Sequence, residues 1–304
     1  MNNKINIRNN ITGICIGLLS FFAFSCVNAS NKFILSNDLL SFYVYFFYLK
    51  LFCIIMLMSF GVLISKKHFF TVKNPKLVFI RAIILTANAL TAALAVKFLP
   101  LDIFYSILFI MPLIITLMGY LVLKERFNFI QLLALIIGLF GVLIIIQPVF
   151  NVVDNANFFI GFFLAIFVAF TGALAAIFVK KYLPNEKAFS SIFYALLMSF
   201  ILSIIFLLGD SSNSKNMIPD LSVIPVILIS ATGTIIGSSM YVLAYQKAKS
   251  QFVAPTQYTQ MIWGITFGYL LFNDLPNQFT LIGCSIIIVA NIINAYSTKA
   301  EQLK

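Results

Sequence analysis

A lone lysine inside an apolar stretch is the residue of this sequence best placed to do chemistry. Lys50 lies near the middle of the stretch 40–64, with Leu49 and Leu51 on either side. A charge at the centre of a membrane-spanning helix costs about 2.5–3.5 kcal/mol even on insertion-derived scales. Lys50 is therefore expected to face a cavity, and the alternative is a lysine that snorkels to the membrane interface.

Acidic residues are missing from the places where a buried lysine would need them. The chain has nine Asp and Glu residues, and all of them fall outside the apolar stretches. Carbonyls, hydroxyls, water or an anionic group of a substrate would have to stabilise the Lys50 ammonium. Proton-coupled extrusion of cations usually requires a buried carboxylate. The sequence thus favours an exchanger or facilitated carrier for a carboxylate-bearing substrate, with Lys50 as its counter-charge.

Other polar residues recur at helical spacing within apolar stretches and are candidate substrate-binding residues. Asn88 and Thr91 share one small polar face, and Gln260 and Trp263 follow each other at a spacing of three, with Tyr258 nearby. The Trp263 ring could stack on a flat substrate. For each of these residues the alternative is ordinary helix packing or interhelical hydrogen bonding, worth about 0.6 kcal/mol apiece.

Three further residues predict how helices bend or pack. Pro112 cannot donate a hydrogen bond to the Leu108 carbonyl, so it can kink its helix and could serve gating. Gly233 and Gly237 form a small-xxx-small spacing, which permits close approach of two helices.

Enzymes, metal sites and nucleic-acid binding find little support. The chain has one histidine and four cysteines, without a CxxC pair, an HExxH or a GxSxG motif. No cofactor or metal ion is therefore expected, and a membrane-embedded enzyme or a scaffold is the alternative from another class. The 20 basic residues give a net charge of +11 but are scattered between apolar runs. A nucleic-acid site would gather them on one face.

The elements that must position these residues are membrane-spanning helices. The chain of 304 residues is 62% hydrophobic and only 10% charged, whereas soluble domains carry about 25% charged residues. An apolar stretch of about 20 residues crosses a bilayer as a helix. We therefore predict an all-α polytopic membrane protein with ten transmembrane helices, at 11–32, 40–64, 77–96, 103–123, 129–148, 158–180, 188–208, 221–244, 250–272 and 279–297.

Basic residues predict the orientation of these helices. Sixteen Lys and Arg fall on the side that both termini share, Arg81 among them, and three fall on the other side: Lys32, Lys97 and Lys215. Cytoplasmic loops carry the excess of basic residues, so both termini are expected in the cytoplasm. The first stretch also resembles a cleavable signal peptide ending near Ala29. We expect it to be retained, because cleavage would leave nine spans, which do not divide into two equal sets.

Ten spans divide into two sets of five, over residues 1–148 and 149–304. An odd number of spans per set forces opposite orientations, so we predict two inverted five-helix repeats with the substrate site between them. An offset of 149 residues aligns Glu125 with Asp274, Ala134 with Gly283, and Gly141 with Ala290.

The order of several short motifs resembles that of a known protein family. Pro112, the run Leu123-Lys124-Glu125-Arg126, Gln131 and Gly141-Val142 follow the order of motifs in the EamA-type transporters of the drug/metabolite transporter superfamily. The second half departs from the pattern, with Asp274 for Glu and Met261 where a proline is usual. The stretch from Ala254 to Pro276 is similar to the branch of the family that takes up S-adenosylmethionine.

The resemblance implies a secondary transporter in the bacterial inner membrane that moves a small metabolite by alternating access between its repeats. S-adenosylmethionine or a similar carboxylate-bearing metabolite is the leading substrate hypothesis, and an amino-acid exporter or uptake carrier is the alternative. The expected partners are the metabolite and the lipid bilayer, and monomer and homodimer both stay open.

Overall fold

The computed structural model is a bundle of helices, and it describes residues 2–64, 71–124, 129–150, 156–209, 218–274 and 276–302. No strand occurs in these ranges. The elements are α1 (Asn2–Ser36), α2 (Phe42–Ile64), α3 (Pro75–Phe98), α4 (Leu101–Leu108), α5 (Ile110–Leu123), α6 (Phe129–Phe150), α7 (Ala156–Tyr182), α8 (Ala188–Gly209), α9 (Ile224–Lys247), α10 (Ser250–Val253), the 3-10 helix η1 (Ala254–Tyr258), α11 (Thr259–Phe272) and α12 (Gln278–Gln302).

Seven helical segments of the described chain are long and apolar enough to cross a membrane, judged by length and composition. They correspond to seven of the ten predicted spans, and the fourth, Ile103–Leu123, extends over both α4 and α5. The three other predicted spans fall on α6, on α10 to α11, and on α12. Shorter apolar stretches occur in α6 and α12, at Leu132–Gly141 and Gln278–Ala290.

Helix bounds repeat along the chain at an interval of 149 residues. Adding 149 to the bounds of α3 gives those of α9, and adding it to the bounds of α5 gives those of α11. The same step takes the first residues of α4 and α6 to those of α10 and α12. Even the left-handed residues that end α5 and α11, Lys124 and Asn273, correspond, each with a φ of 54°. The two halves therefore share one order of elements.

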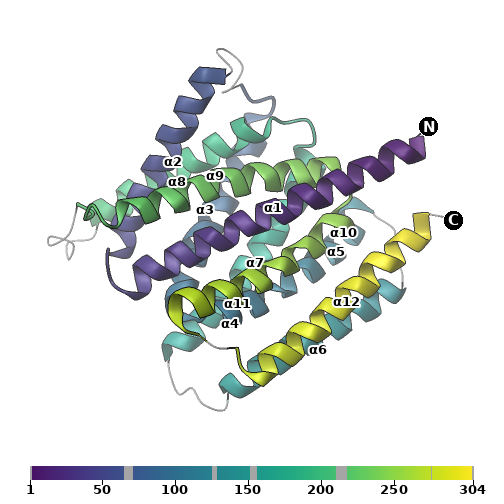
Figure 1. The fold of residues 1–304 in the computed structure, drawn as a ribbon. Coiled ribbons are helices and arrows are strands. Elements are labelled where there is room, and N and C mark those ends of the chain that lie inside the picture. Colours follow the sequence, from purple (N-terminus) through teal and green to yellow (C-terminus); the bar gives the residue numbers. More distant parts are fainter. Residues whose placement is uncertain are drawn as a thin grey trace.

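The two halves interlace rather than standing side by side as separate bundles. The first helix of each half packs against the third helix of the other half, because α1 lies along α9 and α7 lies along α3. The second helices follow the same rule, since α2 contacts α9 and α8 contacts α3. Figure 1 shows α1 crossing beside α9, and it places both chain termini at the same end of the molecule.

Close approach of α1 and α9 depends on small residues. A Cβ added at Gly233 would lie 2.8 Å from a Val27 side-chain carbon, and one at Gly237 would lie 3.0 Å from the Phe24 ring. Ser20 of α1 donates a hydrogen bond of 2.8 Å to the Gly237 carbonyl. The two glycines thus lie at the contact between α1 and α9, where a side chain would push the helices apart.

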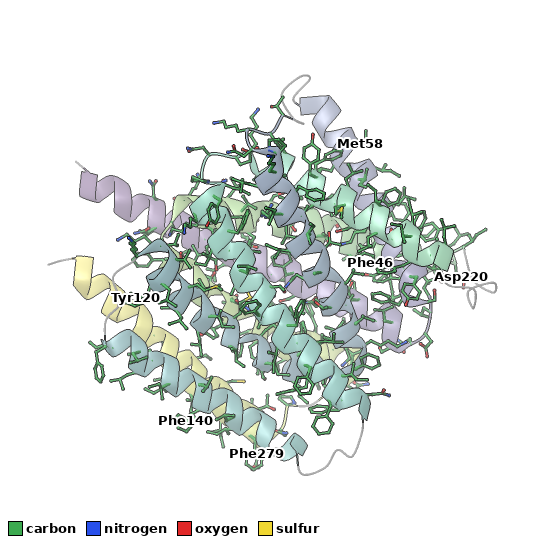
Figure 2. All side chains as sticks on the ribbon, turned by 180° about the vertical axis from the view of Figure 1, so that it is seen from behind. Phe46, Met58, Tyr120, Phe140, Asp220 and Phe279 are labelled. Carbon is green, nitrogen blue, oxygen red and sulfur yellow. The ribbon has the colours of Figure 1, made fainter. Side chains whose placement is uncertain are left out.

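Helices α6 and α12 pack on each other along one edge of the bundle (Figure 1). Their outward faces are apolar. Phe140 of α6 is 59% exposed and Phe279 of α12 is 44% exposed, and Figure 2 shows both at this outer edge. Large apolar side chains are also exposed on the other long helices, which suits contact with lipid.

Candidate functional site

A cavity whose wall is mainly apolar but carries several polar side chains lies in the bundle. Its empty volume is about 1200 Å³, including open space at its mouth, and helices from both halves line it. None of the described lining residues is acidic. Polar and charged side chains of the wall include Asn28, Asn31, Lys50, Arg81, Asn88, Ser199, Thr234, Ser238, Tyr241, Gln257 and Gln260.

Lys50 lines this cavity, on the ninth position of α2. The residue is only 3% exposed, and its Nζ lies 4.6 Å from the centre of the Phe46 ring, also on the cavity wall. An aromatic face attracts a cation but does not neutralise it. Within the described residues, neither of the two ion pairs involves Lys50.

Arg81 is a second buried cation on the same wall, which corrects the sequence analysis. Its position six residues after Pro75 suggested a residue at the cytoplasmic end of a span. The structure instead places Arg81 within α3 at 1% exposure, lining the cavity. Its Nη1 donates a 2.6 Å hydrogen bond to the Ser191 hydroxyl, while its Nε has no partner among the described residues. Lys50 is therefore not the only cation held inside the bundle.

Asn88 and Thr91 differ in what they face. Asn88 lines the cavity, and its Nδ2 donates to the Val168 carbonyl at 2.9 Å and to Thr171 Oγ1 at 2.8 Å. Both partners lie on α7, so the amide also ties α3 to the other half. Thr91 is not among the lining residues and donates to carbonyls of its own helix, the nearer one 2.8 Å away at Ala87.

Of the three candidates from 258 to 263, one lines the cavity. Gln260 lines it and is 4% exposed. Tyr258 packs against Phe109 with ring centres 4.9 Å apart, and Trp263 packs edge-to-face on Phe22 of α1 at 4.6 Å. Tyr258 and Trp263 are absent from the wall as described.

Aromatic side chains other than Trp263 form part of the wall. Phe21 and Phe24 of α1 and Tyr241 of α9 all line the cavity, and their ring centres lie 6.0 to 6.3 Å apart. Such rings can stack on a flat group or attract a cation to their faces. Position alone did not reveal this cluster, because phenylalanine recurs throughout the chain.

Two corresponding spans are interrupted where they meet. The helix breaks at Phe109 between α4 and α5, three residues before Pro112, and the 3-10 helix η1 interrupts the corresponding segment between α10 and α11. Because Pro112 has no N–H, the Leu108 carbonyl lacks its usual partner within the helix. Gln257 Nε2 donates to that carbonyl at 3.3 Å. Both Leu108 and Gln257 line the cavity.

An ion pair ties α1 to the start of the second half's last connection, away from the cavity. Lys32 Nζ lies 2.6 Å from Asp274 Oδ2 and 4.5 Å from the centre of the Phe272 ring. The sequence-derived orientation also puts Lys32 and Asp274 on one side of the membrane. Glu125 and Arg126 of the first half's corresponding motif lie outside the described residues.

Metal ligands do not gather anywhere in the described part of the chain, which holds no group of three or more His, Cys, Asp or Glu able to bind an ion.

Apolar helices around a cavity that carries several polar side chains define a multi-pass membrane protein that can enclose a small molecule. The model of the EamA-like transporter family matches residues 11–147 and again residues 159–296. The chain belongs to that family and is a transporter, which confirms the resemblance seen in the sequence. The two matches also show that the chain contains two copies of the family's domain.

Relatives agree with this assignment. The S-adenosylmethionine uptake transporter of Rickettsia bellii is 25% identical over 96% of both chains, and that of Rickettsia prowazekii is 23% identical over 97% of this chain and 96% of its own. An uncharacterized transporter of Helicobacter pylori is 22% identical over 64% of each chain, so this chain spans under two thirds of that relative. A solved crystal structure covers 93% of this chain with a TM-score of 0.70 and 11% identity, a likeness in fold alone.

Proposed function

We propose that this transporter is a secondary carrier for a carboxylate-bearing metabolite, with S-adenosylmethionine as the leading candidate. The observation that carries the proposal is Lys50, a buried cation on the wall of a cavity whose described lining holds no acid. A substrate carboxylate supplies the negative counter-charge for the Lys50 ammonium. The names of the rickettsial relatives support S-adenosylmethionine.

The chemistry of S-adenosylmethionine matches the other parts of the wall. Its carboxylate suits Lys50, with Arg81 as a second positive charge on the cavity wall. Its adenine ring and its sulfonium suit the aromatic cluster of Phe21, Phe24 and Tyr241, because aromatic faces stack on flat rings and attract cations.

Transport by this carrier proceeds by alternating access between two inverted five-helix repeats, with ten spans and both termini in the cytoplasm of a bacterial cell. The exchange of partners between halves supports a two-fold relation, since α1–α9 corresponds to α7–α3. Polar residues at the interrupted helices lie where such carriers bind their substrates. The break ahead of Pro112 is the hinge that we assign to gating.

Uptake of labelled S-adenosylmethionine into vesicles that contain the purified protein tests this proposal. Removing one partner of a buried charge pair costs about 2–5 kcal/mol, so Lys50→Ala should lower apparent affinity about 30-fold or more. Lys97→Ala is the matched control because Lys97 is exposed and pairs with exposed Asp38 at 3.5 Å. Uptake by Lys50→Ala equal to that of the native chain would refute the role of Lys50.

A further inference from the structure

We propose that Gln257 is a substrate-binding residue whose side-chain oxygen accepts a hydrogen bond from an amino group of the transported metabolite. The inference rests on the proposed function and narrows its substrate class to molecules with an α-amino-acid end. Free amino acids and S-adenosylmethionine share this end.

The orientation of the Gln257 amide is fixed by its neighbours. Its Nε2 lies 3.3 Å from the Leu108 carbonyl oxygen and 3.6 Å from the Met111 sulfur. Both neighbours are acceptors, so only the NH₂ group can face them, and the amide cannot be turned around. The Oε1 atom must therefore point away from α4 and α5.

The Gln257 oxygen needs a donor that the described residues do not supply. The residue is 1% exposed and lines the cavity, and its Oε1 is buried without a hydrogen-bond partner in the described chain. An unpaired acceptor away from bulk water costs free energy that a bound N–H group recovers. A carbonyl oxygen accepts but cannot donate, so it selects an amine or ammonium over a second carboxylate.

Gln257 and Arg81 line the same cavity. The Met111 sulfur that faces Gln257 also lies against Gly172 of α7. The Gly172 carbonyl accepts a hydrogen bond of 3.1 Å from Tyr241. Arg81 and these four residues all line the cavity. The Gln257 acceptor and a buried cation therefore face one cavity.

Gln257 also lies where corresponding parts of the two halves meet. Leu108 and Gln257 are 149 residues apart, the interval that relates the halves, and so are Phe109 and Tyr258, whose rings pack at a tilt. Both pairs sit at the interruptions of their spans. A ligand bound to Gln257 would therefore lie beside the point where the broken helices of the two halves touch.

Competition against uptake of labelled S-adenosylmethionine tests the inference in the native chain. Two pairs of competitors are used, and the members of each pair differ only in the α-amino group. One pair is S-adenosylhomocysteine and its deaminated analogue, and the other is methionine and its deaminated analogue. We expect the amine-bearing member of a pair to inhibit about 10-fold better, as for a hydrogen bond to a buried acceptor. Equal inhibition by both members of both pairs would overturn the inference without any variant.

Variants then assign the discrimination to Gln257. In Gln257→Met the advantage of the amine-bearing competitor should fall to within about twofold, while the preference for a carboxylate is kept. Thr259→Ala is the matched control, because Thr259 adjoins the same interruption, donates at 2.8 Å to Thr256 in its own segment and does not line the cavity. Discrimination that survives in a folded Gln257→Met variant overturns the assignment.

The outcomes separate this inference from the proposed function. A Lys50 variant should lose the preference for carboxylate-bearing compounds. A Gln257 variant should lose the preference for amine-bearing compounds. If the native chain does not carry S-adenosylmethionine, the same pairs are measured against labelled methionine. If the native chain transports neither S-adenosylmethionine nor methionine, this inference is overturned as well.

Discussion

Replacing Arg81 by glutamine removes a buried positive charge from the cavity wall while keeping a donor toward Ser191, which Arg81 reaches at 2.6 Å. Lys50 lies 14 residues before Ile64, the last residue of α2, whereas Arg81 lies six residues after Pro75, the first residue of α3. At about 1.5 Å per residue, the two cations differ in depth by about 10–15 Å.

The effect of Arg81 on a carboxylate bound at Lys50 follows from this spacing. Because this depth difference is the smallest separation the two charges can have, Arg81 contributes at most about 1–2 kcal/mol at an effective dielectric constant of about 20. Arg81→Gln should therefore weaken binding of a carboxylate-bearing ligand by up to about 30-fold. Arg81→Lys, which keeps the charge, should retain most of the affinity.

Competition by S-adenosylmethionine and by its decarboxylated analogue provides the assay, since the two compounds differ only in the carboxylate. In Arg81→Gln vesicles the inhibition constant of S-adenosylmethionine should rise relative to that of the analogue. A variant that weakens both compounds equally, or neither, would refute the electrostatic role and leave Arg81 a packing residue that acts through Ser191.

Two further predictions concern the bundle rather than the substrate. Gly233→Ala should destabilise the purified protein by about 1–3 kcal/mol through overpacking, because its Cβ would lie 2.8 Å from a side-chain carbon of α1. Thermal unfolding in detergent measures this change. Gly138→Ala, whose nearest neighbour would be 3.8 Å away, should be neutral. Asp274→Asn should lower the stability by about 1 kcal/mol, because it removes the charge opposite Lys32 at 2.6 Å across a partly exposed pair. Asp38→Asn, in a more exposed pair with a separation of 3.5 Å, should leave the melting temperature unchanged, and equal shifts in both variants would contradict the role of burial.

Apolar stretches and their spacing predicted the helical class and most element positions, because a bilayer selects for long hydrophobic runs. Lys50 could be found for the same reason, since a charge at mid-span stands out. Arg81 could not, because a basic residue six positions into a helix looks the same whether it snorkels to the interface or turns inward. Arg81 turns inward because it hydrogen-bonds Ser191 of another helix, a contact that spacing along the sequence cannot predict.

The expected face of Gln260 and Trp263 shows a second limit. Both residues lie in the regular helix α11, where a spacing of three leaves their side chains about 60° apart around the axis, so only Gln260 reaches the cavity. Phe22 of α1 then occupies the space beside Trp263. Which neighbouring helix fills a groove is a tertiary property, so the aromatic wall is built by Phe21, Phe24 and Tyr241 instead.

The interlacing of α1 with α9 has a consequence for how the protein is made. Between Ser36, the last residue of α1, and Ile224, the first of α9, lie 187 residues of the chain. At about 5–20 residues per second, α1 spends roughly 10–40 s in the membrane before its main partner has been synthesised. During that interval Ser20, Phe24 and Val27 are without Gly237 and Gly233, their neighbours in α9. The first half therefore stays in the membrane without the contacts of α1 with α9 and of α3 with α7 until the second half has been made.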